Sequence, residues 1–249
     1  STSSPLVTFG GALFASFPLF YSTSFGSAYW VWLLILFTFI IQAVSYEFQN
    51  KAGNLFGVRT FQIGLIINGI LGPLLLGGAV ATFFTGSNFI VEKGNITDFM
   101  QPVISHWANG SRGLDVLLNP WVVIFGISVV FLARILGTLY INNNVNDDII
   151  RGRVRKQLLV NTVLFLLFFL PFLIVTLVGE GYAVNEAGVI VMEPMKYLNN
   201  LLAMWPLAII LLVGVVLLLF GIVKTVLKPE YVRGIWPAGI GVVLVVLVL

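Results

Sequence analysis

Long stretches without a single charged residue limit what this chain can fold into. The first charge is Glu47, so residues 1–46 carry none. A helix of that length would measure about 69 Å at ~1.5 Å per residue, which is about two crossings of a ~30 Å hydrocarbon core. Of the 249 residues, 59% are hydrophobic and only 9% are charged, whereas roughly a quarter are charged in soluble domains. The sequence therefore predicts a membrane protein.

The other uncharged runs predict further membrane-spanning helices. They cover residues 60–91, 157–179, 197–223 and 234–249, and one more apolar stretch contains Arg134 as its single charge. The small polar residues Ser22 to Ser27 predict a turn inside the first run. We therefore expect one all-α integral membrane domain over residues 1–249, a polytopic transmembrane helix bundle of about seven spans. These spans lie near 5–21, 28–46, 61–85, 120–141, 157–178, 201–223 and 235–249.

Basic residues fall mainly on one side of such a bundle. Nine Lys and Arg residues lie in one set of alternate connecting segments, which are 47–60, 142–156 and 224–234. Three lie in the other set, which are 22–27, 86–119 and 180–200. Cytoplasmic loops carry an excess of Lys and Arg, so we expect the first set in the cytoplasm. The net charge of +3 is too small to indicate a nucleic-acid partner.

Small residues at helical spacing indicate close helix packing. The stretch VTFGGALFASFPLFYSTSF, Val7 to Phe25, combines large aromatic residues with Gly and Ala. Helices in lipid associate through dispersion contacts that small side chains permit, and a packed neighbour makes a proline tolerable. A similar pattern recurs near residues 64–78. The packing candidates are Gly10, Gly11, Ala15, Pro18, Gly72 and Gly77.

The same residues carry a resemblance. The run GGALFASFPLFYSTSF, with its Phe17-Pro18 step and Tyr21, resembles the second helix of subunit II of the cytochrome bd quinol oxidases. QAVSYEFQNKAG is similar to the cytoplasmic end of that family's next helix, where an acid (here Glu47) lies between two aromatic residues before a lysine. INGILGPLLLGGAVATFFTG resembles the following helix. The family's usual Arg-Pro pair before the acid is replaced by Gln42-Ala43, which puts any role of that arginine in doubt here.

The resemblance implies a haem-free subunit of a quinol:oxygen oxidoreductase of aerobic respiration, located in the bacterial cytoplasmic membrane. It implies a partner, subunit I, that carries the b-type and d-type haems, together with a small accessory subunit, membrane lipid and a structural quinone. The chain starts at Ser1 and stops inside an apolar run. We therefore expect a fragment that lacks the family's N-terminal helix and its C-terminal part.

The residue types agree with a chain that binds no haem or metal itself. There is no cysteine, which excludes thiolate metal sites and iron–sulfur clusters held by this chain. The single histidine, His106, falls in a predicted external loop, whereas axial haem ligands of membrane proteins usually lie inside helices. The sequence shows no phosphate-binding loop, nucleophile triad or metal-ligand cluster, so we expect no catalytic residue in this chain.

Two charged residues at the predicted spans have two interpretations each. Glu47 is either an interfacial carboxylate paired with Lys51 four residues later, or an entry group for protons that serve oxygen reduction in the partner. Arg134 lies about 10 Å from the cytoplasmic end of its span at ~1.5 Å per residue. It either extends its side chain to the interface or pairs with a buried group.

Three further features of the sequence bear on its interpretation. The loop NNNVNDDIIRGRVRK, residues 142–156, is an orientation signal that could also touch anionic lipid. Two glycosylation-like triplets, Asn95-Ile-Thr97 and Asn109-Gly-Ser111, are chance matches in a bacterial chain. The alternative function is a transporter or permease, because residues 68–73 of the third span could form the broken helix that transporters use.

Overall fold

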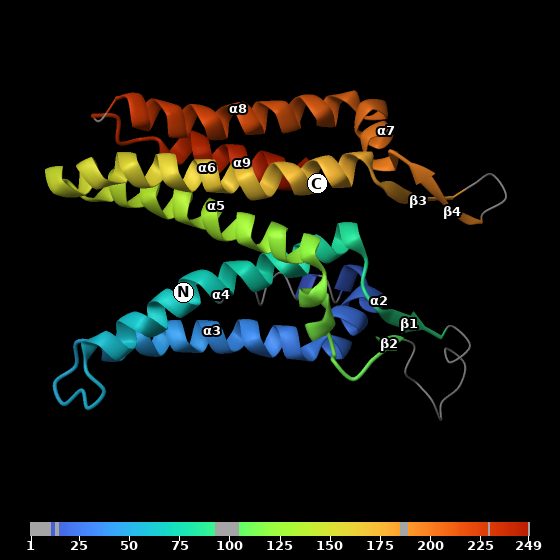
Figure 1. The fold of residues 1–249 in the computed structure, drawn as a ribbon, viewed down its shortest axis with the longest axis horizontal. Coiled ribbons are helices and arrows are strands. Elements are labelled where there is room, and N and C mark those ends of the chain that lie inside the picture. Colours follow the sequence, from blue (N-terminus) through green and yellow to red (C-terminus); the bar gives the residue numbers. More distant parts are fainter. Residues whose placement is uncertain (1–10, 13–14, 93–104, 185–188, 229, 249) are drawn as a thin grey trace. The chain divides into compact units, whose positions relative to one another are not determined.

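The computed structural model describes residues 11–12, 15–92, 105–184, 189–228 and 230–248 (Figure 1). The chain forms two compact units, residues 1–126 and 127–249, and each is described by itself. Nearly all the regular structure is helical, so the prediction of an all-α polytopic membrane bundle is confirmed.

Unit 1 begins with short helical elements where we expected a turn. Helix α2 (Pro18–Tyr21) leads into the π-helix η1 (Ser22–Ser27). The Thr23 hydroxyl donates to the Leu19 carbonyl at 2.8 Å, and the Ala28 amide donates to the Thr23 carbonyl at 3.2 Å. The turn predicted at Ser22 to Ser27 is therefore wrong in position. The Thr23 side chain bonds back to the preceding helix, and the break comes at Ala28.

Two long helices form the body of unit 1. They are α3 (Tyr29–Phe48) and α4 (Val58–Thr85). Val31, Ile35 and Leu75 are the buried centre of their contact. A Cβ placed on Gly64 of α4 would lie 2.6 Å from the Ser45 hydroxyl of α3, so the glycine permits this approach. The two backbones therefore run close together, as small residues in membrane helices allow.

A short hairpin and the start of a third long helix complete unit 1. Strands β1 (Phe89–Val91) and β2 (Ser105–Trp107) pair antiparallel. The 3-10 helix η3 (Leu114–Leu118) follows, and then α5 (Pro120–Asn144), whose first residues belong to this unit. A Cβ on Gly126 of α5 would lie 2.7 Å from the Leu74 carbonyl oxygen of α4. We did not predict these strands.

Unit 2 contains the rest of α5 and six further elements. They are α6 (Asp148–Val178), β3 (Glu180–Val184), β4 (Ile190–Pro194), α7 (Lys196–Ala203), α8 (Trp205–Leu227) and α9 (Ile235–Val248). Strands β3 and β4 form a second antiparallel hairpin. The buried core joins α5, α6, α8 and α9 through Ile135, Leu139, Leu158, Ile222 and Ala238, among others.

Two helix starts differ from the predicted spans for local reasons. Helix α6 begins at Asp148 rather than near 157, because the Asp147 carboxylate caps it by accepting from the amides of Ile149 and Ile150. The predicted span 201–223 begins at Trp205 because Pro206 lies in the first turn of α8, where proline is favoured but cannot continue a preceding helix. Residues 196–203 form the separate helix α7.

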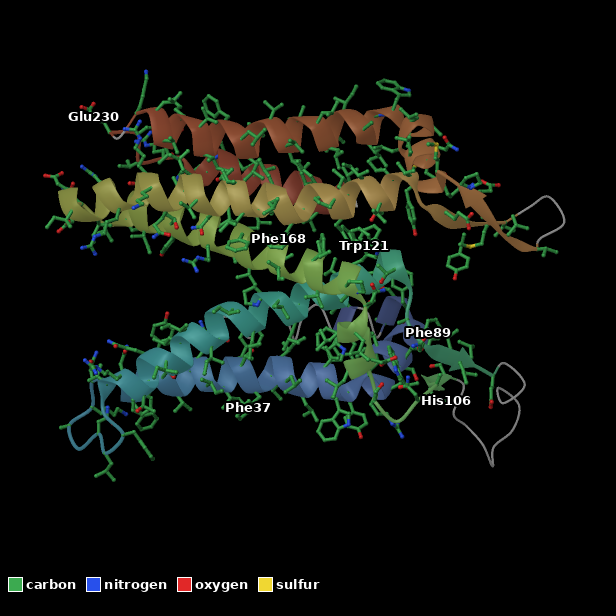
Figure 2. The ribbon with its side chains drawn as sticks, viewed as in Figure 1. Phe37, Phe89, His106, Trp121, Phe168 and Glu230 are labelled. Atoms are coloured by element: carbon green, nitrogen blue, oxygen red, sulfur yellow. The ribbon has the colours of Figure 1, made fainter. Side chains whose placement is uncertain are left out.

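Five helices in the described part of the chain are long and apolar enough to cross a membrane. They are α3, α4, α5, α6 and α8, and α9 is shorter at 14 residues. The predicted span 5–21 falls mainly outside the described residues, so it stays a prediction. Many large apolar side chains on these helices are exposed, and Val163 is one of them. Phe37 is another (Figure 2).

Glycines hold α8 and α9 together in unit 2. A Cβ on Gly214 would lie 2.8 Å from the Gly241 carbonyl oxygen, and one on Gly221 would lie 2.5 Å from the Gly234 carbonyl oxygen. A Cβ on Gly241 would lie 2.6 Å from the Leu218 amide nitrogen. These atoms are backbone and cannot rotate away. Helices α8 and α9 can therefore approach this closely only because glycine has no side chain.

We predict that Gly241→Ala lowers the stability of the purified protein by about 1–3 kcal/mol, as overpacking of a core does. Gly239→Ala on the same helix is the matched control, because nothing lies within 4 Å of a Cβ there. Thermal unfolding in detergent should show a lower midpoint for Gly241→Ala alone. Equal midpoints for the two variants would contradict the described α8–α9 contact.

Candidate functional site

Glu47 lies in the last turn of α3 and forms an ion pair. Its Oε1 is 2.6 Å from the Lys51 Nζ, and that nitrogen also lies 4.6 Å from the centre of the Phe48 ring. The Glu47 side chain is 62% exposed, and its neighbours Tyr46 and Phe48 are exposed as well. Within this chain these two aromatic residues leave the carboxylate open to water. Such an exposed pair adds little stability.

The packing candidates of unit 1 differ in their surroundings. Gly72 and Gly77 of α4 are buried, and a Cβ on Gly72 would lie 3.6 Å from the Thr38 hydroxyl of α3. Gly11 and Ala15 are exposed, and nothing lies within 4 Å of a Cβ on Gly11. Gly10 and the side chain of Pro18 lie outside the described residues. The packing role of these positions in the first predicted span stays a prediction.

Polar side chains lie inside the membrane helices without complete hydrogen bonding. Asn68 of α4 is 8% exposed, and its Oδ1 has no partner among the described residues. The same holds for the buried Oγ1 of Thr162 in α6. Arg134 of α5 is exposed, and we find no ion pair for it in the described part of the chain. Its two interpretations both stay open.

The hairpin of unit 1 holds His106, and the following helix η3 holds a carboxylate that the sequence analysis did not predict. His106 lies on β2 opposite Ile90 (Figure 2). Nearby, Asp115 of η3 accepts four side-chain hydrogen bonds. The donors are the Ser111 hydroxyl at 2.6 Å, the Asn88 amide at 2.9 Å, the Trp107 indole at 2.9 Å and the Asn109 amide at 3.1 Å. The triplet Asn109-Gly-Ser111, which looked like a chance match, thus supplies two of these donors.

This network sets the acidity of Asp115. Partial burial would raise the pKa of its carboxyl, but the bonds from Ser111, Asn88, Asn109 and Trp107 outweigh burial and lower the pKa from 3.8 to about 2. A carboxylate with this many donors organises the loop and takes no part in proton transfer near neutral pH. Among the described residues, no group of three or more His, Cys, Asp or Glu could hold a metal ion.

A cavity lies among the described residues of each unit. The cavity in unit 1 has a volume of about 440 Å³ and is mostly apolar, with walls from η1, α3, α4, both strands of the hairpin and η3. Phe25 and Trp32 stack in its wall with ring centres 4.1 Å apart, and the Trp32 indole donates to the Ser24 hydroxyl at 3.3 Å. The cavity in unit 2 is also about 440 Å³ but is polar, and it lies where α6 begins.

These features define a class of protein. It is a polytopic α-helical membrane protein whose described residues include no group that could hold a metal ion, and Arg134 is the charged residue that lies in the middle of a long helix. The family model for cytochrome bd terminal oxidase subunit II matches residues 5–249. The chain belongs to this family, and the resemblance seen in the sequence is confirmed.

Curated relatives agree with the family match. The chain is 26% identical over 165 residues to cytochrome bd-I ubiquinol oxidase subunit 2 of Escherichia coli strain K12, covering 65% of this chain and 41% of the relative. It is 23% identical over 155 residues to cytochrome bd ubiquinol oxidase subunit 2 of Bacillus subtilis strain 168, covering 61% and 40%. The match to a probable cytochrome oxidase subunit 2 of Haemophilus influenzae is 24% over 181 residues, covering 73% and 45%. The chain spans less than half the length of these relatives.

We predict that residues 105–119 of unit 1 loosen in acid because Asp115 becomes protonated. The pKa of the folded form, about 2, is below the ordinary value of 3.8. Ionised Asp115 therefore stabilises the fold above about pH 3.8, and this contribution is lost as the pH falls toward 2. Hydrogen exchange of residues 105–119 should accelerate over this range, and Asp115→Asn should show the faster exchange already at pH 7.

Asp148→Asn is the control for this experiment, because the Asp148 side chain is fully exposed and such a change normally shifts stability by no more than about 0.5 kcal/mol. Wild-type exchange rates in Asp115→Asn at pH 7 would contradict a structural role for the network.

Proposed function

We propose that this chain is the haem-free subunit II of a quinol:oxygen oxidoreductase of the bacterial cytoplasmic membrane, and that it scaffolds a haem-bearing subunit I. Membership of the cytochrome bd subunit II family carries the proposal. The residue types support it, since axial haem ligands are most often His, Cys or Met and the whole sequence has one histidine and no cysteine. Of its methionines, Met192 lies on β4, and Met195 and Met204 lie at the ends of the short helix α7. His106 lies on a strand of the hairpin, not in a membrane helix. The b-type and d-type haems then belong to the partner.

The exposed apolar faces of the helices support lipid and protein partners. Residues such as Phe37, Ile63 and Val163 are more than half exposed on helices long enough to span a membrane. In the proposed complex these faces meet subunit I, a small accessory subunit and lipid tails. The segments 47–60, 142–156 and 224–234 face the cytoplasm, as their excess of basic residues indicates.

The transporter alternative has less support. It relied on a broken third span at Asn68, Gly72 and Pro73, because transporters bind substrate where helices unwind. Helix α4 instead continues from Val58 through Pro73 to Thr85. The family match favours the oxidase.

The apolar cavity of unit 1 supports the proposal of a structural quinone. Ligand pockets of about 300–1,000 Å³ with mostly apolar walls suit such molecules, and this cavity is about 440 Å³. Aromatic rings of Phe25, Trp32 and Phe83 line it, with the hydroxyl groups of Thr23 and Ser24 as hydrogen-bonding groups. A quinone ring could stack on the aromatic side chains while one of its carbonyls accepts from the Ser24 hydroxyl, because the Thr23 hydroxyl already donates to the Leu19 carbonyl.

We predict that the natively purified complex absorbs with d-type haem bands and releases quinone on extraction with organic solvent. His106→Ala should leave the haem spectrum unchanged, because this residue lies on an external strand and ligates nothing in the proposed complex. A complex without d-type haem bands would overturn the oxidase proposal. Loss of one haem band in assembled His106→Ala would show that this chain does supply a ligand.

We propose further that Glu47 admits protons on the cytoplasmic side. Its carboxylate lies at the end of α3 and is open to water, so it can exchange protons with the solvent. The competing explanation is the ion pair with Lys51 alone. Oxygen reduction to water consumes protons, and carboxylates near the membrane often relay them.

We predict that Glu47→Gln lowers oxygen consumption at matched haem content, because glutamine keeps the shape but cannot cycle a proton. Lys51→Met is the first control, since it breaks the pair and leaves the carboxylate. Glu193→Gln is the second, since it breaks the comparable 2.7 Å pair with Lys196 in the segment predicted to be external. Both controls should keep wild-type turnover. Wild-type turnover in Glu47→Gln would contradict the proton-entry role. The ion pair with Lys51 would then be the remaining explanation for Glu47.

A further inference from the structure

We infer that unit 2 carries a binding site for a phosphate group where α6 begins. The polar cavity of about 440 Å³ takes its walls from α5, α6, α8 and the segment after α8. Asn142 of α5 and Thr225 of α8 form buried parts of the wall, and Arg151, Gly152 and Arg155 of α6 also line it. This inference does not depend on the oxidase function.

The Arg151 guanidinium supplies the main observation. Its Nε is buried and has no hydrogen-bond partner among the described residues. One terminal nitrogen lies 4.0 Å from the Asp148 carboxylate, which is at the outer limit of an ion pair, and the Asp148 side chain is fully exposed. Buried N–H donors of charged groups normally have an acceptor. A hydrogen-bond acceptor bound in the cavity would give the Arg151 Nε its missing partner.

A second arginine lies on the same face of α6. Arg155 follows Arg151 by four residues, so both side chains project from one side of the helix, and both line the cavity. The planar fork of arginine matches the oxygens of a phosphate group and binds them with charge-assisted hydrogen bonds. Gly152 also lines the cavity, and nothing lies within 4 Å of a Cβ there. The space beside the two arginines is therefore open.

The acidic residues of the cavity restrict the charge of the ligand. Asp148 and Glu230 also line it (Figure 2 labels Glu230 beyond the end of α8), so the lining carries two positive and two negative side chains. A phosphodiester with a single negative charge fits this balance better than a more highly charged anion. Arg151 and Arg155 lie just before the uncharged part of α6 that starts at Gln157. That is the depth at which the headgroups of a membrane lie.

The proposed ligand is thus a phosphate group. Either an anionic phospholipid of the cytoplasmic leaflet or free phosphate can supply it. Binding is measured on the purified membrane complex in neutral detergent, with phosphatidylglycerol and inorganic phosphate as separate probes. Native mass spectrometry reports retained lipid, and the thermal midpoint reports stabilisation by either probe.

The test compares an arginine double variant with a matched control. Arg151→Gln with Arg155→Gln should weaken phosphatidylglycerol binding at least about tenfold, because charge-assisted hydrogen bonds are lost. Arg153→Gln should bind like the wild type, since this exposed residue on the same helix does not line the cavity. Stabilisation by inorganic phosphate with the same arginine dependence would identify the free anion as the source. If the double variant binds each probe as tightly as the wild type does, the proposed site is overturned.

A cavity-filling variant keeps the test decisive if the double variant fails to assemble. Gly152→Leu should block binding without a clash, because the added side chain enters open space. Gly137→Leu on α5 is its control, since this exposed helical glycine also has nothing within 4 Å of a Cβ and lies outside the cavity. Wild-type binding in assembled Gly152→Leu would overturn the site.

Discussion

Backbone hydrogen bonding in lipid is the constraint on which this structure depends. The hydrocarbon core offers no water, so every amide and carbonyl of a crossing segment must be satisfied within the chain, and long helices result. Lipid tails are as apolar as the side chains, so burial alone does not draw these helices together. Contact then depends on how closely backbones can approach. Gly64, Gly126 and Gly241 each meet a neighbouring helix at a distance that a Cβ would block.

The positions of the long helices could be predicted because charge is so costly in lipid. Helices α3, α4 and α5 lie close to the predicted spans 28–46, 61–85 and 120–141. Helix ends respond to local chemistry that a count of charges does not contain. The Asp147 cap extends α6, and Pro206 separates α7 from α8. The two hairpins could not be predicted, since a strand of three to five residues has no clear pattern without its partner.

At the candidate sites, only features that follow from residue type and sequence spacing could be predicted. The Glu47–Lys51 pair follows from a four-residue spacing on one helix. The donors to Asp115 are spread from Asn88 to Ser111, and only the folded chain brings them to this carboxylate. The glycine contacts between α8 and α9 likewise depend on which faces meet. Such tertiary neighbours leave no periodic signal in a single sequence.

Polar groups whose hydrogen bonds are all made within the chain differ from buried polar groups that have no partner. Asp115 accepts four bonds within the chain, and its pKa of about 2 keeps it ionised and fixed. The Arg151 Nε, the Asn68 Oδ1 and the Thr162 Oγ1 are buried without partners among the described residues. An unmade bond of a buried group costs more than a made bond gains, so we expect groups from outside the described residues to bond to these three atoms. For Asn68 and Thr162, inside membrane helices, a neighbouring subunit or an ordered water suits the depth. For Arg151, beside a polar cavity at the membrane boundary, a phosphate group suits both the charge and the depth.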